Sequence, residues 1–391
     1  MIHTTIRIFE VVGILGCVSS SIYYLICLWS TFVFLREHVP GRAPSPASRP
    51  LPPVSILKPL KGTDPDIYES FRSHCLQDYP EYEIVFGVSD PNDPAVASVQ
   101  QVQREFPDRR IHLVVCSNKL GANVKVSNLE QMLPAARYQH LLVNDSDIHV
   151  GNDYLRRVVA PLADLQVGMV TCLYRGAAAS TLGSQLESLG ISTDFCAGVL
   201  VARQLEGGLR FGLGSTLAFR RTELERIGGF RSIVDFLADD YELGRRIADL
   251  GLQVVLAHTV VETHLPAYDL RGFWAHQLRW ARGVRDSRAG GYLGLVSTYG
   301  LMWGLLTVLA GGTEPWSWAV LALIVMLRLA VALRVGLGVL RDRRLLRHLW
   351  LLPVRDLVAV VVWVASLAGH TVTWRGDRFE LKNGRLIRID P

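Results

Sequence analysis

This 391-residue sequence has few lysines, no cysteines at a paired spacing and only a small net charge. Only five of its 41 lysines and arginines are lysines, and 36 acidic residues leave a net charge of +5. A balance this close to neutral argues against a nucleic-acid partner, because such partners require a strongly basic surface. The six cysteines form no CxxC or other metal-binding spacing, which indicates reduced thiols in a cytosol-facing protein.

Several common motifs are also missing. The sequence has no internal repeat, no GxGxxG after a strand-like run, and no GxxxxGKS/T loop. These absences argue against a dinucleotide-binding Rossmann site and against a P-loop ATPase. A hydrophobic content of 49% excludes a disordered chain.

The apolar residues are concentrated in long runs. Mean hydropathy is +0.23, which is high for a soluble protein. Residues 11–35 carry no charge and, at 1.5 Å per residue, can cross a ~30 Å hydrocarbon core. The run is too long for a signal peptide, lacks an A-x-A cleavage site and ends at Arg36. The basic residues after it predict that the chain enters the cytosol there.

Three more apolar runs follow at residues 290–313, 316–340 and 349–374. Arginines cluster at 341–347 and after 375, whereas the loop at 311–315 has none, so the positive-inside rule places both clusters inside. Four full crossings would instead put the tail opposite the middle of the chain. One C-terminal segment is therefore expected to be re-entrant or interfacial. Arg328 and Arg355, within these runs, are expected to contact a lipid headgroup, to snorkel, or to pair with a neighbour such as Asp356.

The expected organisation has five parts. They are an N-terminal transmembrane anchor (1–37), a proline-rich linker (38–53), a cytosolic domain (54–289), C-terminal membrane segments (290–374) and a basic tail (375–391). We expect a multi-pass protein of the inner, cytoplasmic membrane with its large domain facing the cytosol.

Strand-like and helix-like patterns alternate within the middle of the chain. Strands are expected at 54–57, 83–88, 111–115 and 140–143, and helices at 66–74, 94–106 and 124–133. The alternation predicts an α/β fold with a mainly parallel sheet covered on both faces. Ligands bind such sheets beyond the carboxyl ends of the strands. Two of the expected strands end there in acidic motifs, Ser89-Asp90 and Asp145-Ser146-Asp147.

The second of these motifs has two carboxylates at a spacing that can serve one ligand. Residues two apart in extended chain point the same way, so Asp145 and Asp147 can face one site. Paired carboxylates suit Mg²⁺ or Mn²⁺ that holds a diphosphate. The alternative is an Asx turn or a helix cap, in which the same residues only stabilise the backbone.

Three later segments also carry candidate site residues. Asp239 and Asp240 open a helical pattern, where either can cap the helix or project into a cleft. The segment 276–280 reads His-Gln-Leu-Arg-Trp and precedes an apolar run, so it can serve a site or anchor a helix at the membrane surface. Gly214, in the glycine-rich segment 212–216, indicates either an acceptor-side loop or a tight turn.

The order of these motifs resembles the D, D, D, (Q/R)xxRW signature of family 2-type glycosyltransferases with the GT-A fold, whose domain is Rossmann-like. The segments are Lys58-Pro59-Leu60-Lys61-Gly62, Ser89-Asp90, Asp145-Ser146-Asp147, Asp239-Asp240 and Arg279-Trp280. The sequence is most similar to ceramide glucosyltransferases and to the related bacterial hopanoid-biosynthesis glycosyltransferase. Further shared segments are 54–62, Asp78-Tyr79-Pro80, Asp93-Pro94-Ala95, 125–129, Asp240-Tyr241 and Trp374-Arg375-Gly376.

The resemblance also implies roles. Asp90 would contact the uridine, Asp147 would hold the diphosphate-bound Mg²⁺ or Mn²⁺ with support from Asp145, and Asp240 would be the catalytic base, with Asp239 as the alternative. Arg279 and Trp280 would close over the diphosphate or the acceptor. The remaining expected substrate-binding residues are Lys58, Lys125 and Gly214.

Two positions depart from the family pattern. His276 stands where the last motif normally opens with Gln or Arg. Asp147 is acidic at a position that is not acidic in some ceramide enzymes, which favours the hopanoid branch with a metal-binding D-x-D.

The resulting hypothesis is a metal-dependent, inverting glycosyltransferase that moves a sugar from a UDP-sugar to a hydroxyl of a membrane lipid. The favoured pair is UDP-N-acetylglucosamine and a hopanoid polyol, bacteriohopanetetrol. The alternatives are a ceramide glucosyltransferase that uses UDP-glucose, a processive polysaccharide synthase, and a non-catalytic membrane protein that binds or transports lipid. A transporter would show repeated membrane halves, which the sequence lacks.

Overall fold

The computed structural model describes residues 2–37, 51–312, 314–374 and 376–389, so most of the predicted linker at 38–53 lies outside the described residues. The chain folds into two compact units. We call residues 40–179, 205–267 and 377–391 the sheet unit, and residues 1–39, 180–204 and 268–376 the helical unit.

The sheet unit is built on eight strands in the order β3-β2-β1-β4-β7-β6-β8-β5. The strands are β1 (Val54–Leu60), β2 (Tyr82–Val88), β3 (Arg110–Val115), β4 (His140–Val143), β5 (Ile148–His149), β6 (Val167–Ala177), β7 (Leu217–Arg220) and β8 (Gln253–His264). The pairs β3-β2, β2-β1, β1-β4 and β6-β8 are parallel. The pairs β4-β7, β7-β6 and β8-β5 are antiparallel.

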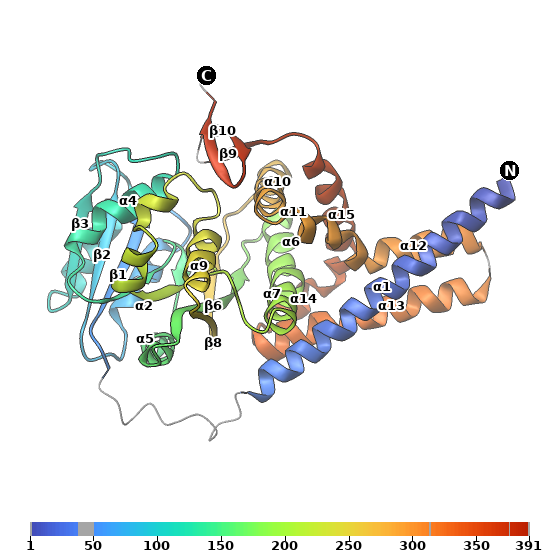
Figure 1. Ribbon diagram of the computed structural model, residues 1–391, viewed down its shortest axis with the longest axis horizontal. Helices are drawn as coiled ribbons and strands as arrows, with labels where there is room; N and C mark the ends of the chain where they lie inside the picture. Colours follow the sequence, from blue (N-terminus) through green and yellow to red (C-terminus); the bar gives the residue numbers. More distant parts are fainter. Residues whose placement is uncertain (1, 38–50, 313, 375, 390–391) are drawn as a thin grey trace. The chain divides into compact units, whose positions relative to one another are not determined.

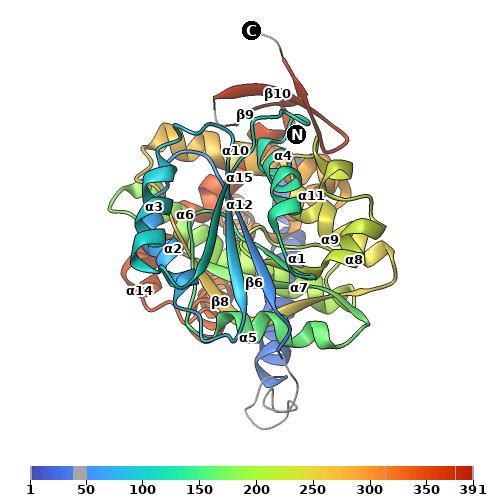
Figure 2. The same ribbon diagram turned by 90° about the vertical axis from the view of Figure 1, so that its left-hand side faces the viewer.

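Helices cover both faces of this sheet, which explains why β1 and β2 are buried at every position. The helices are α2 (Ile67–Cys75), α3 (Ala95–Glu105), α4 (Val124–Met132), α5 (Tyr154–Val159), α8 (Arg221–Arg226) and α9 (Asp239–Asp249). Figure 2 shows α2 and α3 on one side of the strands and α4, α8 and α9 on the other. The predicted α/β class is confirmed, and the sheet is mixed: the predicted parallel order holds for its first four strands, and β7 enters antiparallel between β4 and β6.

β1 is longer than the predicted strand because it runs on through a proline. Its ladder with β4 ends at Leu57–Val143, whereas its ladder with β2 continues to Leu60–Val88. Pro59 lacks a backbone N–H and is tolerated in a central strand because β4 no longer pairs there. The early end of β4 leaves an opening at the sheet edge, where the acidic motif follows.

The last two strands of the sheet unit form a hairpin, β10 (Asp377–Lys382) and β11 (Arg385–Arg388), with Lys382 opposite Arg385. Its turn is Asn383-Gly384, and both residues have positive φ, 52° and 78°. Two consecutive left-handed residues are what a two-residue hairpin turn requires, and Asn-Gly is the pair that adopts them most readily.

The helical unit contains α1 (Ile2–Arg36), α6 (Leu182–Gly190), α7 (Cys196–Leu205), α10 (Leu270–Ser287), α11 (Ala289–Gly294), α12 (Gly300–Gly311), α13 (Pro315–Leu333), α14 (Leu345–His348), α15 (Leu352–Leu367) and the short strand β9 (Thr371–Trp374). α1, α12 and α13 run beside one another (Figure 1). Close approach is possible because glycines face large side chains there, as Gly16 faces Trp303 and Gly304 faces Leu321.

Among the described residues, three helices are long and apolar enough to cross a membrane: 4–36, 315–339 and 345–367. A fourth candidate is the pair 289–298 and 300–311, which is bent by 48°. The predicted N-terminal and C-terminal membrane helices are thus confirmed as candidate spans, and the bend is the sort of break that a re-entrant segment has.

The hairpin constrains how many times the chain can cross. A bilayer cannot pass through a compact folded unit, and residues 205–267 and 377–391 belong to the same unit. The chain between them must therefore cross an even number of times, so at least one of the three C-terminal apolar segments does not span.

This parity can be measured with protease sites in sealed membrane vesicles. We expect a site inserted in the exposed turn at Asp108 and a site appended after Pro391 to be cut from the same side. A site at the N-terminus, beyond α1, is the control and should be cut only from the opposite side. Cleavage of the first two sites from opposite sides would contradict the parity.

Candidate active site

The acidic turn Asp145-Ser146-Asp147 follows β4 directly, as the sequence predicted. Asn144, fully buried, anchors the turn: its side-chain amide donates to the Ser215 carbonyl at 2.5 Å and to the Tyr154 hydroxyl at 2.8 Å. The end of β4 is thereby tied to the segment that carries Gly214. The only sign of this role of Asn144 in the sequence is its place directly after a predicted strand.

Lys58 lies beneath this turn. Its ammonium donates to the Asp145 carbonyl at 2.9 Å, and the residue is fully buried. Burial lowers the pKa of Lys58 to about 7, although the carboxylates of Asp147 and Asp145 oppose the shift. Lys58 therefore supports the turn from below through the backbone.

Asp147 is held by β8. The Thr263 hydroxyl donates to a carboxylate oxygen of Asp147. The backbone carbonyl of Asp147 accepts from the backbone N–H of His264. Burial and the nearby Asp145 carboxylate raise the pKa of Asp147 to about 6. A bound cation would relieve this crowding of negative charge.

Lys125 joins two motifs that are about a hundred residues apart in sequence. Its ammonium lies 2.8 Å from an Asp145 carboxylate oxygen and 3.0 Å from one of Asp239. The lysine sits in the first turn of α4, which Asn123 caps by accepting from the Val126 N–H at 3.2 Å. These two carboxylates, with Asp240, raise the pKa of Lys125 against the effect of burial, so the lysine stays charged.

Asp239 and Asp240 open α9 but face different partners. Asp239 is buried and paired with Lys125. Asp240 accepts from the backbone N–H of Gly214 at 2.7 Å and of Tyr241 at 2.8 Å. Burial and the charge of Asp239 raise the pKa of Asp240 to about 6, while Lys125 lowers it.

Gly214 lies between the two acidic motifs. A Cβ at this position would meet an Asp145 carboxylate oxygen at 2.9 Å and an Asp240 carboxylate oxygen at 3.3 Å. Only glycine lets the backbone come this close to both carboxylates. The segment 212–216 contains a tight turn, in which the Thr216 N–H donates to the Leu213 carbonyl at 3.0 Å. This turn lies beside both acidic motifs, and an acceptor-side role for it stays a prediction.

Asp90 follows β2, two strands away from β4 in the sheet. It is exposed, and its carboxylate accepts from the Asn92 N–H at 2.8 Å. It lies at the same edge as the acidic turn because β2, β1 and β4 are parallel.

Residues 63–66, in the loop that follows β1, were not among the predicted site residues. The Ser146 hydroxyl donates to an Asp64 carboxylate, and Asp66 lies 2.7 Å from Nδ1 of His264. Asp66 has a φ of 51°, an unusual conformation for a residue other than glycine. The loop therefore contacts both the acidic turn itself, at Ser146, and the end of β8, at His264, a role that its Asp-rich sequence alone does not indicate.

Arg279 and Trp280 lie on α10 of the helical unit. His276, one turn earlier, stacks on Tyr268 at 5.4 Å between ring centroids and lies 4.9 Å from the Trp280 ring. Its Nδ1 is 3.0 Å from a carboxylate oxygen of the buried Glu187. The histidine that departs from the family motif thus positions the ring of Trp280. Farther along α10, Arg282 donates to the carbonyls of Ala368 and Thr371.

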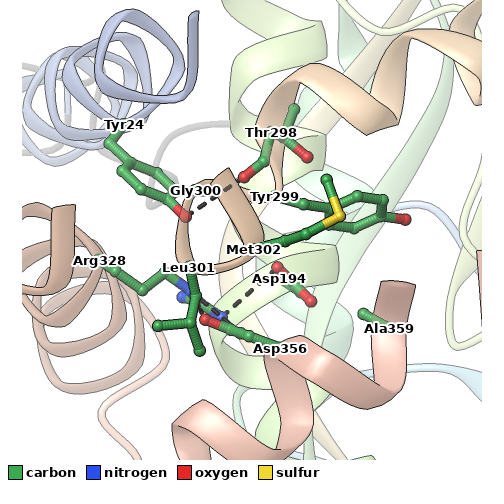
Figure 3. A pocket seen from close by; sticks show the side chains of 10 residues that line it. All are labelled: Tyr24, Asp194, Thr298, Tyr299, Gly300, Leu301, Met302, Arg328, Asp356 and Ala359. Atoms are coloured by element: carbon green, nitrogen blue, oxygen red, sulfur yellow. Dashed lines mark hydrogen bonds and ion pairs between the residues drawn. The ribbon is translucent and has the colours of Figure 1, made fainter. Parts of the chain in front are cut away.

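A small polar cavity lies in the helical unit, lined by Tyr24, Asp194 and Arg328 among others (Figure 3). Arg328 pairs with Asp356 at 2.7 Å and lies 3.5 Å from Asp194. The cavity volume is about 10 Å³, roughly the space that one water molecule requires. Of the roles predicted for Arg328, pairing with Asp356 is the one found.

The family model of glycosyl transferase family 21 matches residues 12–387. The chain belongs to this family. The chain is 22% identical to ceramide glucosyltransferase 1 of Caenorhabditis elegans over 97% of its own length and 82% of the relative's. It is 36% identical to the ceramide glucosyltransferase of Komagataella phaffii, over 29% of this chain and 24% of that protein.

A solved structure shares the fold. The mannosyltransferase PcManGT from Pyrobaculum calidifontis, in complex with GDP-Man and Mn²⁺, superposes with a TM-score of 0.56 at 21% identity. The match covers 92% of this chain and 99% of that one. The predicted GT-A fold of this family 21 glycosyltransferase is thereby confirmed.

The donor set of the family 21 chain fits a divalent cation shared with a substrate. No group of three or more His, Cys, Asp or Glu side chains is arranged to hold a metal within the described part of the chain. Mg²⁺ is usually bound by one or two carboxylates together with substrate phosphates and water, and not by a cage of protein ligands. Asp145, whose carboxylate is 40% exposed, and the crowded Asp147 match that requirement.

Proposed function

We propose that this chain transfers a sugar, with inversion, from a UDP-sugar to a hydroxyl of a membrane lipid, with Asp240 as the base. The observation that carries the proposal is that the two adjacent aspartates at the start of α9 have different partners. Asp239 forms an ion pair with Lys125, whereas the Asp240 carboxylate accepts hydrogen bonds from two backbone N–H groups, those of Gly214 and Tyr241. A carboxylate held this way has a fixed direction and a pKa near neutral.

The base acts on the acceptor. A lipid hydroxyl is a poor nucleophile at neutral pH, and a carboxylate with a pKa of about 6 can accept its proton as the new bond forms. The anomeric carbon–oxygen bond to the diphosphate breaks as the bond to the acceptor oxygen forms. One displacement on an α-linked donor gives a β-glycoside, so a second nucleophilic carboxylate is not required.

The leaving diphosphate requires positive charge. Asp145 and Asp147 would hold Mg²⁺ or Mn²⁺, which, when bound, neutralises the charge that develops on the departing diphosphate. Lys125 keeps Asp145 and Asp239 in place, and Lys58 holds the backbone of the turn. Asp90, at the same edge of the sheet, would contact the uridine, and Arg279 and Trp280 would close over the diphosphate or the acceptor.

The acceptor is proposed to be a lipid because membrane helices precede and follow the catalytic segments. A lipid hydroxyl that reacts at the membrane surface is spared extraction of its apolar body, which costs about 0.8 kcal/mol for each CH₂. The names of the relatives support the lipid class. We retain UDP-N-acetylglucosamine and a hopanoid polyol as the favoured pair. Ceramide with UDP-glucose is the second, supported by the ceramide glucosyltransferase relatives.

We further propose that the sheet unit faces the cytosol of a bacterial inner membrane. The arginine-rich segment at 341–347 and the tail then both lie inside, as the positive-inside rule requires. With α1 crossing once, the bent pair that ends in α12 and the helix α13 form a crossing hairpin. The charge of the arginine-rich segment and of the tail then leaves 345–367, which contains α15, as the segment that stays on the cytosolic side.

Asp240→Asn should lower kcat by about 10²–10⁴-fold, because the proton acceptor is lost while the shape is kept. Binding of the UDP-sugar, measured by calorimetry, should change little. The matched control is Asp249→Asn at the far end of the same helix, where an exposed carboxylate pairs with Arg210 and Arg245.

The pH profile gives the same residue a second test. Because the active form is deprotonated, kcat/KM should rise with pH through about 6 and level off above it. Near wild-type turnover in Asp240→Asn, or a wild-type rate that stays constant down to pH 4.5, would place the base elsewhere, with Asp239 as the first alternative.

Metal removal should abolish transfer, and Mg²⁺ or Mn²⁺ should restore it. Asp147→Ala should raise the metal concentration needed for half-maximal rate by at least about tenfold, since one of two carboxylate ligands is lost. The control is Asp153→Ala, which removes an exposed carboxylate paired with Arg157. Full activity in excess EDTA would show that lysine and arginine alone neutralise the diphosphate.

The acceptor is identified by offering purified enzyme UDP-glucose and UDP-N-acetylglucosamine in turn, with bacteriohopanetetrol or ceramide in detergent. We expect label in one organic-extractable lipid that carries a single sugar. Label on the hopanoid from UDP-N-acetylglucosamine supports the first pair, and glucose on ceramide supports the second. Label in a long water-soluble polymer would overturn the lipid acceptor in favour of a polysaccharide synthase. No transfer and no lipid-dependent donor turnover would favour a binding or transport protein.

A further inference from the structure

The C-terminal hairpin packs against the segment that leads into the acidic pair of α9. The Leu386 N–H donates to the Asp235 carbonyl at 2.7 Å, and the Leu237 N–H donates to the Gly384 carbonyl at 3.0 Å. Phe236, between them, forms a bridge with Arg385, whose guanidinium lies 5.1 Å from the centre of the phenyl ring. Segment 235–237 thus pairs with the hairpin as an added piece of strand.

The same segment is held from its other side by the start of α4. The side-chain amide of Asn123 donates to the Phe236 carbonyl at 2.7 Å, and its backbone N–H donates to the Val234 carbonyl at 2.8 Å. The Ala122 N–H donates to the Asp235 carboxylate at 2.9 Å. Two residues after Asn123 comes Lys125, the partner of Asp239.

These contacts leave the entry to α9 little freedom. Segment 235–237 lies between a helix start that carries Lys125 and a turn that lies at the end of the chain. Only Ala238 separates it from Asp239 and Asp240. A shift of this segment would therefore move the Asp240 carboxylate relative to Gly214, to which it is hydrogen-bonded.

We propose that the C-terminal hairpin is a positioning element for the acidic pair, and that Arg385 and the turn at Gly384 act through Phe236 to fix where Asp240 points. This inference rests on the proposed role of Asp240 as the base. The turn of this hairpin, which lies within the predicted basic tail, would then help to position the catalytic residue. Proton transfer is sensitive to such placement, and an error of about 1 Å can cost about a hundredfold in rate.

The first test exploits two arginines of the hairpin. Arg385→Ala should lower kcat by about tenfold and leave the KM for the UDP-sugar within about twofold, because the role proposed for the hairpin is placement of Asp240 and not binding of the donor. Arg385→Lys, which keeps a cation over the ring, should recover most of the loss. Arg388→Ala is the matched control: it removes an exposed guanidinium paired with Asp377 at 2.7 Å, and it should match wild type.

The second test uses two glycines that both have a positive φ. Gly384 and Gly376 both have positive φ, 78° and 92°. A Cβ on Gly384 would lie 3.2 Å from the Phe236 ring, whereas a Cβ on Gly376 would meet nothing within 4 Å. Gly384→Ala should therefore lower kcat by about tenfold or more, and Gly376→Ala should not, although both introduce backbone strain.

Hydrogen exchange separates this proposal from the proposed function. Arg385→Ala and Gly384→Ala should lose protection at residues 235–241, a readout that needs no activity. Loss of kcat in step with a raised KM, equal effects of the two glycine variants, or no recovery with lysine would overturn the positioning role. If wild-type protein transfers no sugar while the hairpin variants still lose protection, the proposed function is wrong, but the packing of the hairpin against segment 235–237 is supported.

Discussion

The ion pairs of Lys125 are the interaction on which the candidate site depends. Asp145, Asp147, Asp239 and Asp240 come from two distant segments and would repel one another at the sheet edge. The lysine lies within 3.0 Å of one carboxylate from each segment, so it joins β4 to α9 and offsets part of the repulsion. Removing one partner of a buried pair typically costs about 3–5 kcal/mol, because the other is left without compensation.

The strand ends could be predicted from sequence because their chemistry is local. A short apolar run followed by Asn-Asp-Ser-Asp indicates a buried strand that stops where polar ligands begin, and β4 matches the predicted bounds 140–143. The role of Asp239 could not be predicted, since its distinction from Asp240 lies in a lysine more than a hundred residues earlier. Asn144, Thr263 and Asn123 were missed for the same reason: their partners are set by how the strands are ordered, and β7 and β8 enter that order from later in the chain.

The C-terminal hairpin could have been predicted from the alternation of its residues, although the prediction was based on their charge. Residues 377–388 alternate polar and apolar around Asn383-Gly384, the strongest short-range pattern for a two-residue hairpin. Five basic residues between 375 and 388 led only to the prediction of a basic tail on the inner side of the membrane. In the structure, Phe379, Leu381 and Leu386 are buried, and the basic residues lie between them in the alternation. The charge of these residues carries no information on the hairpin, whereas the period-two alternation indicates its two strands.

The start of a helix explains how two adjacent aspartates can take different roles. Successive residues of an α-helix point about 100° apart, so Asp239 and Asp240 cannot face one partner together. One carboxylate turns to Lys125 and forms an ion pair with it, and the next turns to Gly214, where two backbone N–H groups hold it. Burial, and to a lesser extent the charge of Asp239, raise the pKa of Asp240. The backbone N–H groups set the direction of the group that we propose accepts the proton, while its neighbour contributes to its basicity.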